Sequence, residues 1–357
     1  MRSFFRNLQN LLPLVAAQPF SSRTLNAVHY GGLVESFGIR SARSSAMPLY
    51  LQIEPTVRCN LSCLMCPSSI DRKRNQTEDL SYADFKRIIN SIPSALHVHL
   101  QGFGEPLLNR DILRMISYCK SRSIRVTLVT NGQLLSDQMC RALAGSGLDA
   151  IGISMDGATK SKYEKIRKGA SFGKLVSNIR SLAATRDSAL SRMKIFLVFV
   201  MMKENISELP LVVDFASKAG LDGVRCQHVQ FDREVKGNAS RSVLSSHNRP
   251  MAEAQVSCAS GLAKNSGLDC FIQGFEKSRS FICPWPWAGV YITCKGEVSP
   301  CCNVCCASFG NIMSQRIDAI YNSEEYKEFR KKHLRGCIPA VCKGCPQEYY
   351  NGEKVIL

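Results

Sequence analysis

Three cysteines near the start of the chain have a spacing suited to an iron–sulfur cluster. Cys59, Cys63 and Cys66 form a C-x3-C-x2-C pattern just after the alternating apolar run 49–54. Three thiolates so close in sequence can ligate three irons of a [4Fe–4S] cube and leave the fourth iron free to bind a small molecule. A structural zinc site would need a fourth Cys or His nearby, and none follows Cys66 within 30 residues. The pattern therefore predicts chemistry at an open iron.

Segments of glycine and polar residues follow in order along the chain. They are Gly-Phe-Gly-Glu-Pro-Leu-Leu at 102–108, Thr-Asn-Gly at 130–132 and Ile-Ser-Met-Asp-Gly at 153–157. Each stands at the end of an apolar run with strand character. In barrels of alternating strands and helices, functional groups gather at the C-terminal ends of the strands. These segments should therefore meet the cysteine loop.

Together, the cysteine loop and these segments resemble the radical S-adenosylmethionine (SAM) superfamily over about residues 49–232. The resemblance implies that the open iron binds SAM. One electron from the cluster then cleaves SAM to methionine and a 5′-deoxyadenosyl radical, which takes a hydrogen atom from the substrate. Such radical chemistry belongs to the cofactor, and the protein positions and shields it.

The resemblance also implies a set of SAM-binding residues. They are Met65, Gly102, Gly104, Glu105, Asn131, Ser154, Asp156 and Arg167. In this set Glu105 would receive the amino group, and Arg167 would pair with the carboxylate. Structural roles stay open beside these: Met65 could fill a core gap, and Ser154 or Asp156 could cap the next helix.

The apolar pattern predicts the elements that position these residues. Strand-like runs cover 50–54, 96–101, 125–130, 150–155, 194–201 and 223–229. Helical patterns cover 82–91, 110–121, 136–146, 172–184 and 208–219. Alternating strands and helices predict a parallel α/β sheet with right-handed crossovers. Six units match the partial (β/α)6 TIM-type barrel that the resemblance implies.

A second group of cysteines lies near the C-terminus. Between them, the segment 290–298 predicts a hairpin-like pair of strands that turns at Lys-Gly. Cys283, Cys301, Cys342 and Cys345, with their Pro-Trp and Pro-Cys-Cys flanks, resemble the SPASM or shortened "twitch" extension of radical SAM enzymes. The resemblance implies an auxiliary [4Fe–4S] cluster, and a four-cysteine zinc site is the alternative. Further thiols leave the ligand choice and the number of clusters open; they are Cys294, Cys302, Cys305, Cys306 and Cys337.

We divide the chain into an N-terminal arm (1–48), a radical SAM core (49–232), a linker (233–280) and an auxiliary cluster domain (281–357). The arm is Arg-rich and could pass for a targeting segment, but we favour an arm packed under the barrel. Cysteine spacings of metal-site type indicate a reducing compartment. We therefore expect a cytoplasmic location, with a mitochondrial one open if the source is eukaryotic.

Charge and hydropathy limit the partners. The formal net charge is +17, yet the basic residues are spread along the chain, so nucleic acid is unlikely. A phosphorylated or carboxylated substrate fits better. We expect the denser run 327–333 to be a solvated helix face. No apolar stretch is long enough to span a membrane. The chemistry also requires an electron donor such as flavodoxin or ferredoxin.

We expect hydrogen-atom abstraction from a small polar substrate of the sugar, aminocyclitol or nucleotide type, leading to oxidation or epimerisation. Relatives that modify peptides usually carry an extra N-terminal domain, and only 48 residues precede the first strand here. In an epimerisation, a linker thiol, Cys258 or Cys270, could return the hydrogen atom. The alternatives are a radical SAM maturase that modifies a peptide or protein, a non-catalytic Fe–S electron carrier and a zinc-binding nucleic-acid module.

Overall fold

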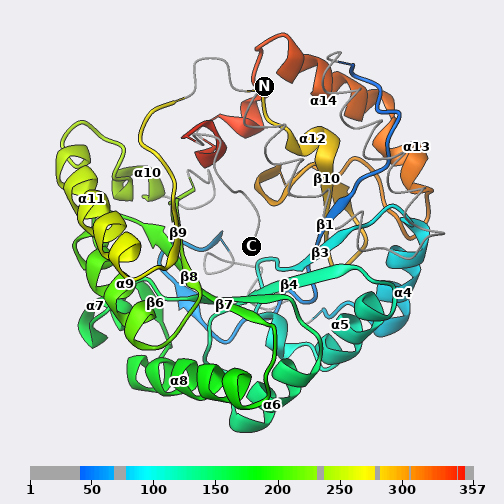
Figure 1. Cartoon of the computed structure of the whole chain (residues 1–357). Helices are drawn as coiled ribbons and strands as arrows, with labels where there is room; N and C mark the ends of the chain where they lie inside the picture. The colour runs from blue at the N-terminus through cyan, green and yellow to red at the C-terminus, as the bar shows by residue number, and fades with distance from the viewer. Residues whose placement is uncertain are drawn as a thin grey trace.

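A curved, mainly parallel sheet organises the computed structural model, which describes residues 41–67, 78–230, 237–277, 282–304, 307–343 and 345–349. The strand order is β11-β10-β1-β3-β4-β5-β7-β8-β9 (Figure 1). The six predicted strands are confirmed as β1 (Tyr50–Ile53), β3 (His97–Leu100), β4 (Arg125–Thr130), β5 (Ala150–Ser154), β7 (Lys194–Met201) and β8 (Gly223–His228). Parallel pairing brings their C-terminal ends to one rim, where the candidate residues were expected.

The sheet extends beyond those six strands. β9 (Asp269–Ile272) pairs parallel to β8, and β10 (Gly289–Ile292) pairs parallel to β1. β11 (Val298–Ser299) then pairs antiparallel to β10. This confirms the hairpin that the Lys-Gly turn predicted, in which Gly296 adopts φ +83°. The C-terminal unit therefore continues the barrel sheet beside β1.

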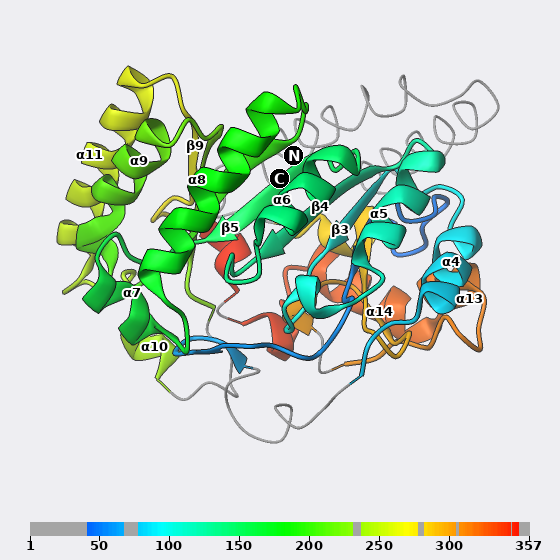
Figure 2. The same cartoon turned by 90° about the horizontal axis from the view of Figure 1, so that it is seen from below.

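Helices cover the outer face of the sheet (Figures 1 and 2). They are α4 (Tyr82–Ser91), α5 (Ile112–Ser121), α6 (Asp137–Gly145), α7 (Lys160–Ile166), α8 (Phe172–Ser188), α9 (Leu209–Lys218) and α11 (Arg249–Asn265). Ser81 and Ser136 cap α4 and α6 by accepting backbone N–H bonds. Apolar residues at helical spacing, such as Phe85, Ile88 and Ile89 of α4, face the sheet and are buried. Helix α7 is an addition to the five predicted helical patterns, and α11 lies within the predicted linker.

Further elements complete the rim and the C-terminal unit. They are β2 (Ser62–Cys63), β6 (Arg167–Lys168), η3 (Pro106–Leu108), η4 (Ile206–Glu208), α10 (Asn238–Arg241), α12 (Trp285–Ala288), η5 (Cys302–Val304), α13 (Ile317–Tyr321), α14 (Glu324–Leu334), η6 (Ala340–Cys342) and η7 (Pro346–Tyr349). No helix in the described ranges is long and apolar enough to cross a membrane.

The start of the described chain packs on the C-terminal unit. Trp287 Nε1 donates a 2.8 Å hydrogen bond to the carbonyl of Ser41. Arg330 Nη1 donates to the carbonyls of Ala42 and Tyr321, at 3.2 and 2.7 Å. The expectation of a solvated helix face at 327–333 is therefore only partly right, because Arg330 is fully buried there. The predicted targeting segment or arm falls mostly at 1–40, outside the described residues.

Candidate active site

The cysteine loop is fixed to the barrel by a small antiparallel pairing. Cys63 in β2 pairs with Arg167 in β6, and the N–H of Leu64 donates a 2.8 Å bond to the carbonyl of Ile166. Cys63 is buried, Cys66 is partly buried and Cys59 is exposed. The loop thus presents its three thiols at the C-terminal rim of the sheet.

The glycine segment after β3 packs directly against the base of this loop. A Cβ on Gly104 would lie 2.1 Å from the carbonyl oxygen of Thr56, and one on Gly102 would lie 2.3 Å from Cγ of Glu54. Glu105 N–H donates a 2.8 Å bond to the carbonyl of Arg58. Glycine is needed at 104 because backbone meets backbone there, and at 102 because the Glu54 side chain fills the space.

Glu105 lines the cavity at this rim but is already well bonded. Its carboxylate accepts from Thr130 Oγ1 at 2.6 Å, Asn131 N at 2.7 Å and Leu107 N at 3.2 Å. Burial raises the pKa of Glu105, and these bonds lower it in part. An ionised carboxylate offers about four acceptor sites. Glu105 therefore braces the strand ends and keeps capacity for one more donor.

Arg167 and Asp156 form a buried ion pair behind the loop. Nε and Nη2 of Arg167 reach Oδ2 of Asp156 at 2.7 and 2.6 Å, and Nη1 points to the Cys63 sulfur at 3.7 Å. Asp156 also accepts from the N–H of Val200 at 2.7 Å. Asp156 is fully buried, and the cavity is lined by Arg167 instead. The structure thus gives Asp156 the task of orienting Arg167.

The other predicted SAM contacts line the same cavity. Met65, Gly102, Gly104, Asn131 and Ser154 all face it, together with the three cysteines of the loop. The side-chain amide of Asn131 also donates a 2.8 Å bond to Asn60 in the loop. Apart from Asp156, the predicted set is therefore gathered around one hollow next to the thiols.

The thiols fit an iron cluster by their chemistry. Burial raises the pKa of Cys63 to about 12, although Arg167 opposes this. Burial likewise raises the pKa of Cys283 and Cys301 well above the usual value, and neighbouring thiols raise it further. Thiolates are the form that binds iron, so a bound cluster would have to keep these cysteines deprotonated against the effect of burial. No three Cys, His, Asp or Glu residues of the described ranges converge on a single-ion site.

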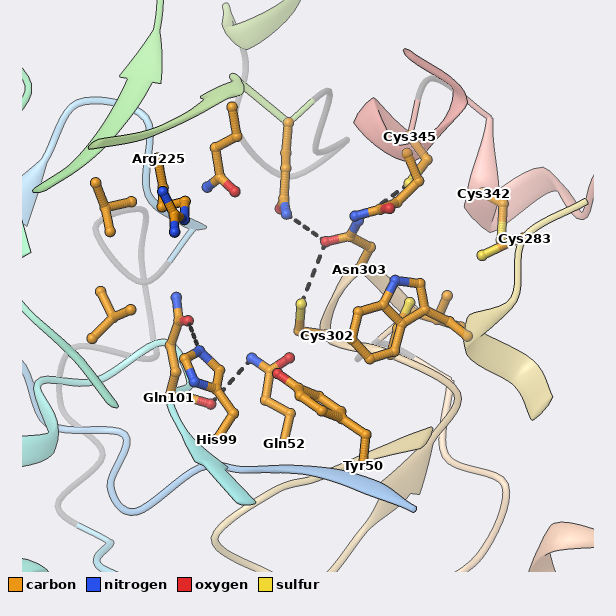
Figure 3. A pocket seen from close by; sticks show the side chains of 18 of the residues that line it. Tyr50, Gln52, His99, Gln101, Arg225, Cys283, Cys302, Asn303, Cys342 and Cys345 are labelled. Atoms are coloured by element: carbon orange, nitrogen blue, oxygen red, sulfur yellow. Dashed lines mark hydrogen bonds between the residues drawn. The ribbon is translucent and has the colours of Figure 1, made fainter. Parts of the chain in front are cut away.

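The four predicted auxiliary ligands line a second cavity. Figure 3 shows Cys283, Cys342 and Cys345 on one side of it. Asn303 Nδ2 donates a 3.2 Å hydrogen bond to the Cys345 sulfur, and His333 Nε2 lies 3.8 Å from the Cys342 sulfur. The additional thiols separate by position. Cys302 lines both cavities, Cys294 is buried, Cys337 is exposed, and Cys305 and Cys306 fall outside the described residues.

The two cavities adjoin. Both are lined by Gln52, Gln101, Val129, Val198, Gln227, Gln230 and Cys302. These residues were not among the predicted site residues. A glutamine such as Gln52 within an apolar strand could have indicated a polar side chain that faces a binding cavity. The two linker thiols lie elsewhere: Cys258 is exposed on α11, and Cys270 on β9 lines neither cavity. A substrate bound at the shared wall would lie between the two cysteine sets.

Comparison with known proteins assigns both parts of the chain. Residues 53–216 match the radical SAM superfamily, and residues 283–346 match the SPASM iron–sulfur cluster-binding domain. The chain is 27% identical to the PqqA peptide cyclase of Gluconobacter oxydans over 312 residues, which cover 84% of this chain and 83% of the relative. It is 26% identical over 301 residues to the tungsten-containing aldehyde ferredoxin oxidoreductase cofactor-modifying protein of Pyrococcus furiosus, covering 79% and 83%.

Solved structures agree with the fold. Streptococcus suis SuiB bound to its precursor peptide SuiA superposes with a TM-score of 0.66 at 18% identity, covering 90% of this chain and 78% of SuiB. The expectation of a small-molecule substrate is wrong, because a relative that spans most of this chain is a peptide cyclase. The length of chain before the first strand was therefore a misleading guide. The chain belongs to the radical SAM superfamily, carries a C-terminal SPASM domain, and uses SAM and [4Fe–4S] clusters, including an auxiliary cluster, as its cofactors.

Proposed function

We propose that this protein is a radical SAM maturase that modifies a peptide or protein substrate. The observation that carries the proposal is the continuous wall shared by the SAM-side cavity and the auxiliary-cluster cavity. The relationship to a peptide cyclase supports it. When bound, the cluster and SAM supply one-electron, hydrogen-abstracting chemistry.

The residues of the chain would hold and shield these partners. Cys59, Cys63 and Cys66 would ligate the SAM cluster, with Arg167 held against Cys63 by Asp156. Cys283, Cys301, Cys342 and Cys345 would ligate the auxiliary cluster. Glutamine side chains on the shared wall, such as Gln52 and Gln101, offer both donors and acceptors. The backbone N–H and C=O groups of a peptide could form hydrogen bonds with these side chains.

Anaerobic reconstitution tests the proposal. The wild-type chain should cleave SAM under dithionite, and Cys59, Cys63 and Cys66 changed together to Ala should abolish cleavage while about four irons, one [4Fe–4S] cluster, remain on the SPASM domain. Candidate peptides encoded beside the gene should gain or lose hydrogen in mass spectra only with the intact chain. Unchanged SAM cleavage in the triple variant would overturn the assignment of the SAM cluster. Zinc in place of the remaining iron would overturn the auxiliary site.

A further inference from the structure

A cluster of lysines lies beside the cysteine loop. Lys160 and Lys165 are exposed on α7, Lys168 is exposed in β6, and Lys174 is exposed near the start of α8. Lys162, also on α7, is partly buried. We call these five residues the lysine face. Five lysines in 15 residues meet only one carboxylate, Glu164.

The lysine face is one strand away from the candidate cluster ligands. In the β2–β6 pairing, Lys168 stands opposite Ser62, and the neighbouring pair joins Arg167 to Cys63. The loop is also tied to the end of α7, through the bond from Leu64 N–H to the carbonyl of Ile166. Figure 1 places α7 and β6 side by side. Lys168 is exposed directly across from Ser62, so the lysine face lies beside the strand that carries Cys63.

Within the described ranges, no residue of the lysine face forms an ion pair, and this sets it apart from many other lysines of the chain. Carboxylates pair with Lys120, Lys194, Lys218, Lys295, Lys327 and Lys331. Glu164 accepts a 3.0 Å bond from the backbone N–H of Phe172. The positive charge beside the loop is therefore left largely uncompensated.

We propose that the lysine face docks an acidic one-electron donor protein that reduces the SAM cluster through the adjacent loop. The proposal rests on the proposed function, because each SAM cleavage consumes one electron. In the transfer the donor protein is oxidised by one electron and the cluster is reduced by one, with no bond made or broken. Uncompensated charge of one sign attracts an oppositely charged partner and raises its association rate. The pairing of β6 with β2 places the docked donor next to the strand that carries Cys63, which gives the electron a short entry route.

The test uses the full-length reconstituted protein and a reduced flavodoxin of strongly negative net charge. Lys160, Lys165 and Lys168 are changed together to Glu, and the control changes Lys194, Lys218 and Lys264 to Glu, which alters the net charge equally. Cluster reduction is followed directly by absorbance at several ionic strengths.

We expect the lysine-face variant to lower the second-order rate constant about tenfold or more at low salt. The rate constant of the lysine-face variant should also depend less on ionic strength, because salt screens a weaker attraction between the two proteins. The control should change the rate less than twofold, and dithionite should reduce all three proteins alike.

An equal rate in the lysine-face variant, or equal slowing in the control, would overturn the proposal. So would a variant that is reduced normally by flavodoxin but binds an acidic peptide substrate more weakly, since the surface would then serve the substrate. Because cluster reduction is measured without SAM or peptide, a chain that fails to cleave SAM would contradict the proposed function without deciding this test.

Discussion

At the scale of single residues, side chains that contact the candidate ligands determine how each site is tuned. Asn303 is held on two sides: its Oδ1 accepts from Gln230 on the shared cavity wall, and its Nδ2 donates to the Cys345 sulfur (Figure 3). Hydrogen bonds to cluster sulfurs are among the factors that set cluster potentials. Asn303 thus joins the substrate side of the cavity to the predicted auxiliary ligand.

We expect Asn303→Leu to make the midpoint potential of the auxiliary cluster more negative. The reduced cluster carries more negative charge on its sulfurs, and the lost N–H bond would have stabilised that charge. The potential is measured by EPR-monitored redox titration in the background with Cys59, Cys63 and Cys66 changed to Ala, where only the auxiliary cluster remains. Asn303→Gln, which keeps an amide donor, should fall between wild type and Leu. A Leu variant that titrates with the wild-type potential would remove Asn303 from this role.

At the scale of elements, the segment between β3 and α5 depends on close backbone contact with the cysteine loop. The cysteine loop follows β1 and includes β2. The glycine segment after β3 packs against the base of this loop. A side chain at Gly104 would meet the backbone carbonyls of Thr56 and Arg58, which have no flexible end to move. The position of the cluster loop therefore depends on the absence of a side chain there.

Gly104→Ala should displace the loop and weaken SAM binding at least tenfold, equivalent to about 1.4 kcal/mol. Isothermal titration of SAM to the anaerobic, oxidised protein measures this effect. Gly173→Ala is the matched control, because a Cβ at that position in α8 has no neighbour within 4 Å. Helix propensity predicts that the control is neutral or stabilising by up to about 1 kcal/mol. Equal SAM affinity in both variants would contradict the close-packing account.

At the scale of the whole molecule, buried histidines make the fold sensitive to acid. Burial lowers the pKa of His99 and of His228 to about 4, and lowers that of His97 well below its usual value. His97 and His99 both hydrogen-bond Thr127 Oγ1, at 2.8 and 2.7 Å, inside the barrel. In the unfolded chain such histidines take up a proton near pH 6.5. Between about pH 6.5 and 4 the unfolded state therefore binds more protons than the folded state.

It follows that the free energy of unfolding should fall as the pH is lowered through this window. Each fully buried histidine contributes up to about 2 kcal/mol of this decrease by pH 5. Anaerobic urea unfolding at pH 7.5 and pH 5 measures the decrease. His99→Gln should reduce it, while His247→Gln, at an exposed position, should leave it unchanged. A decrease that is the same in all three proteins would show that acid acts on the fold through other groups.

The sequence by itself determined the local features of this protein. Short apolar runs between amphipathic helical segments predicted the six central strands, because such a run is recognised from local sequence alone. The spacing of Cys59, Cys63 and Cys66 predicted the cluster loop in the same way, because all three thiols come from one short segment. The Lys-Gly turn predicted the β10–β11 hairpin for a similarly local reason.

Tertiary structure decided whatever depends on segments far apart in the chain. Pairing of β10 with β1 brings Cys283 and Cys301 beside the barrel, and no local pattern encodes that partner. The burial of Asp156 against Arg167, and the joining of two cavities along Gln52 and Gln101, likewise arise only on folding. The substrate class was misjudged from the length of a terminal segment. The shared wall, where we propose that the substrate binds, is instead built from strands that meet only in three dimensions.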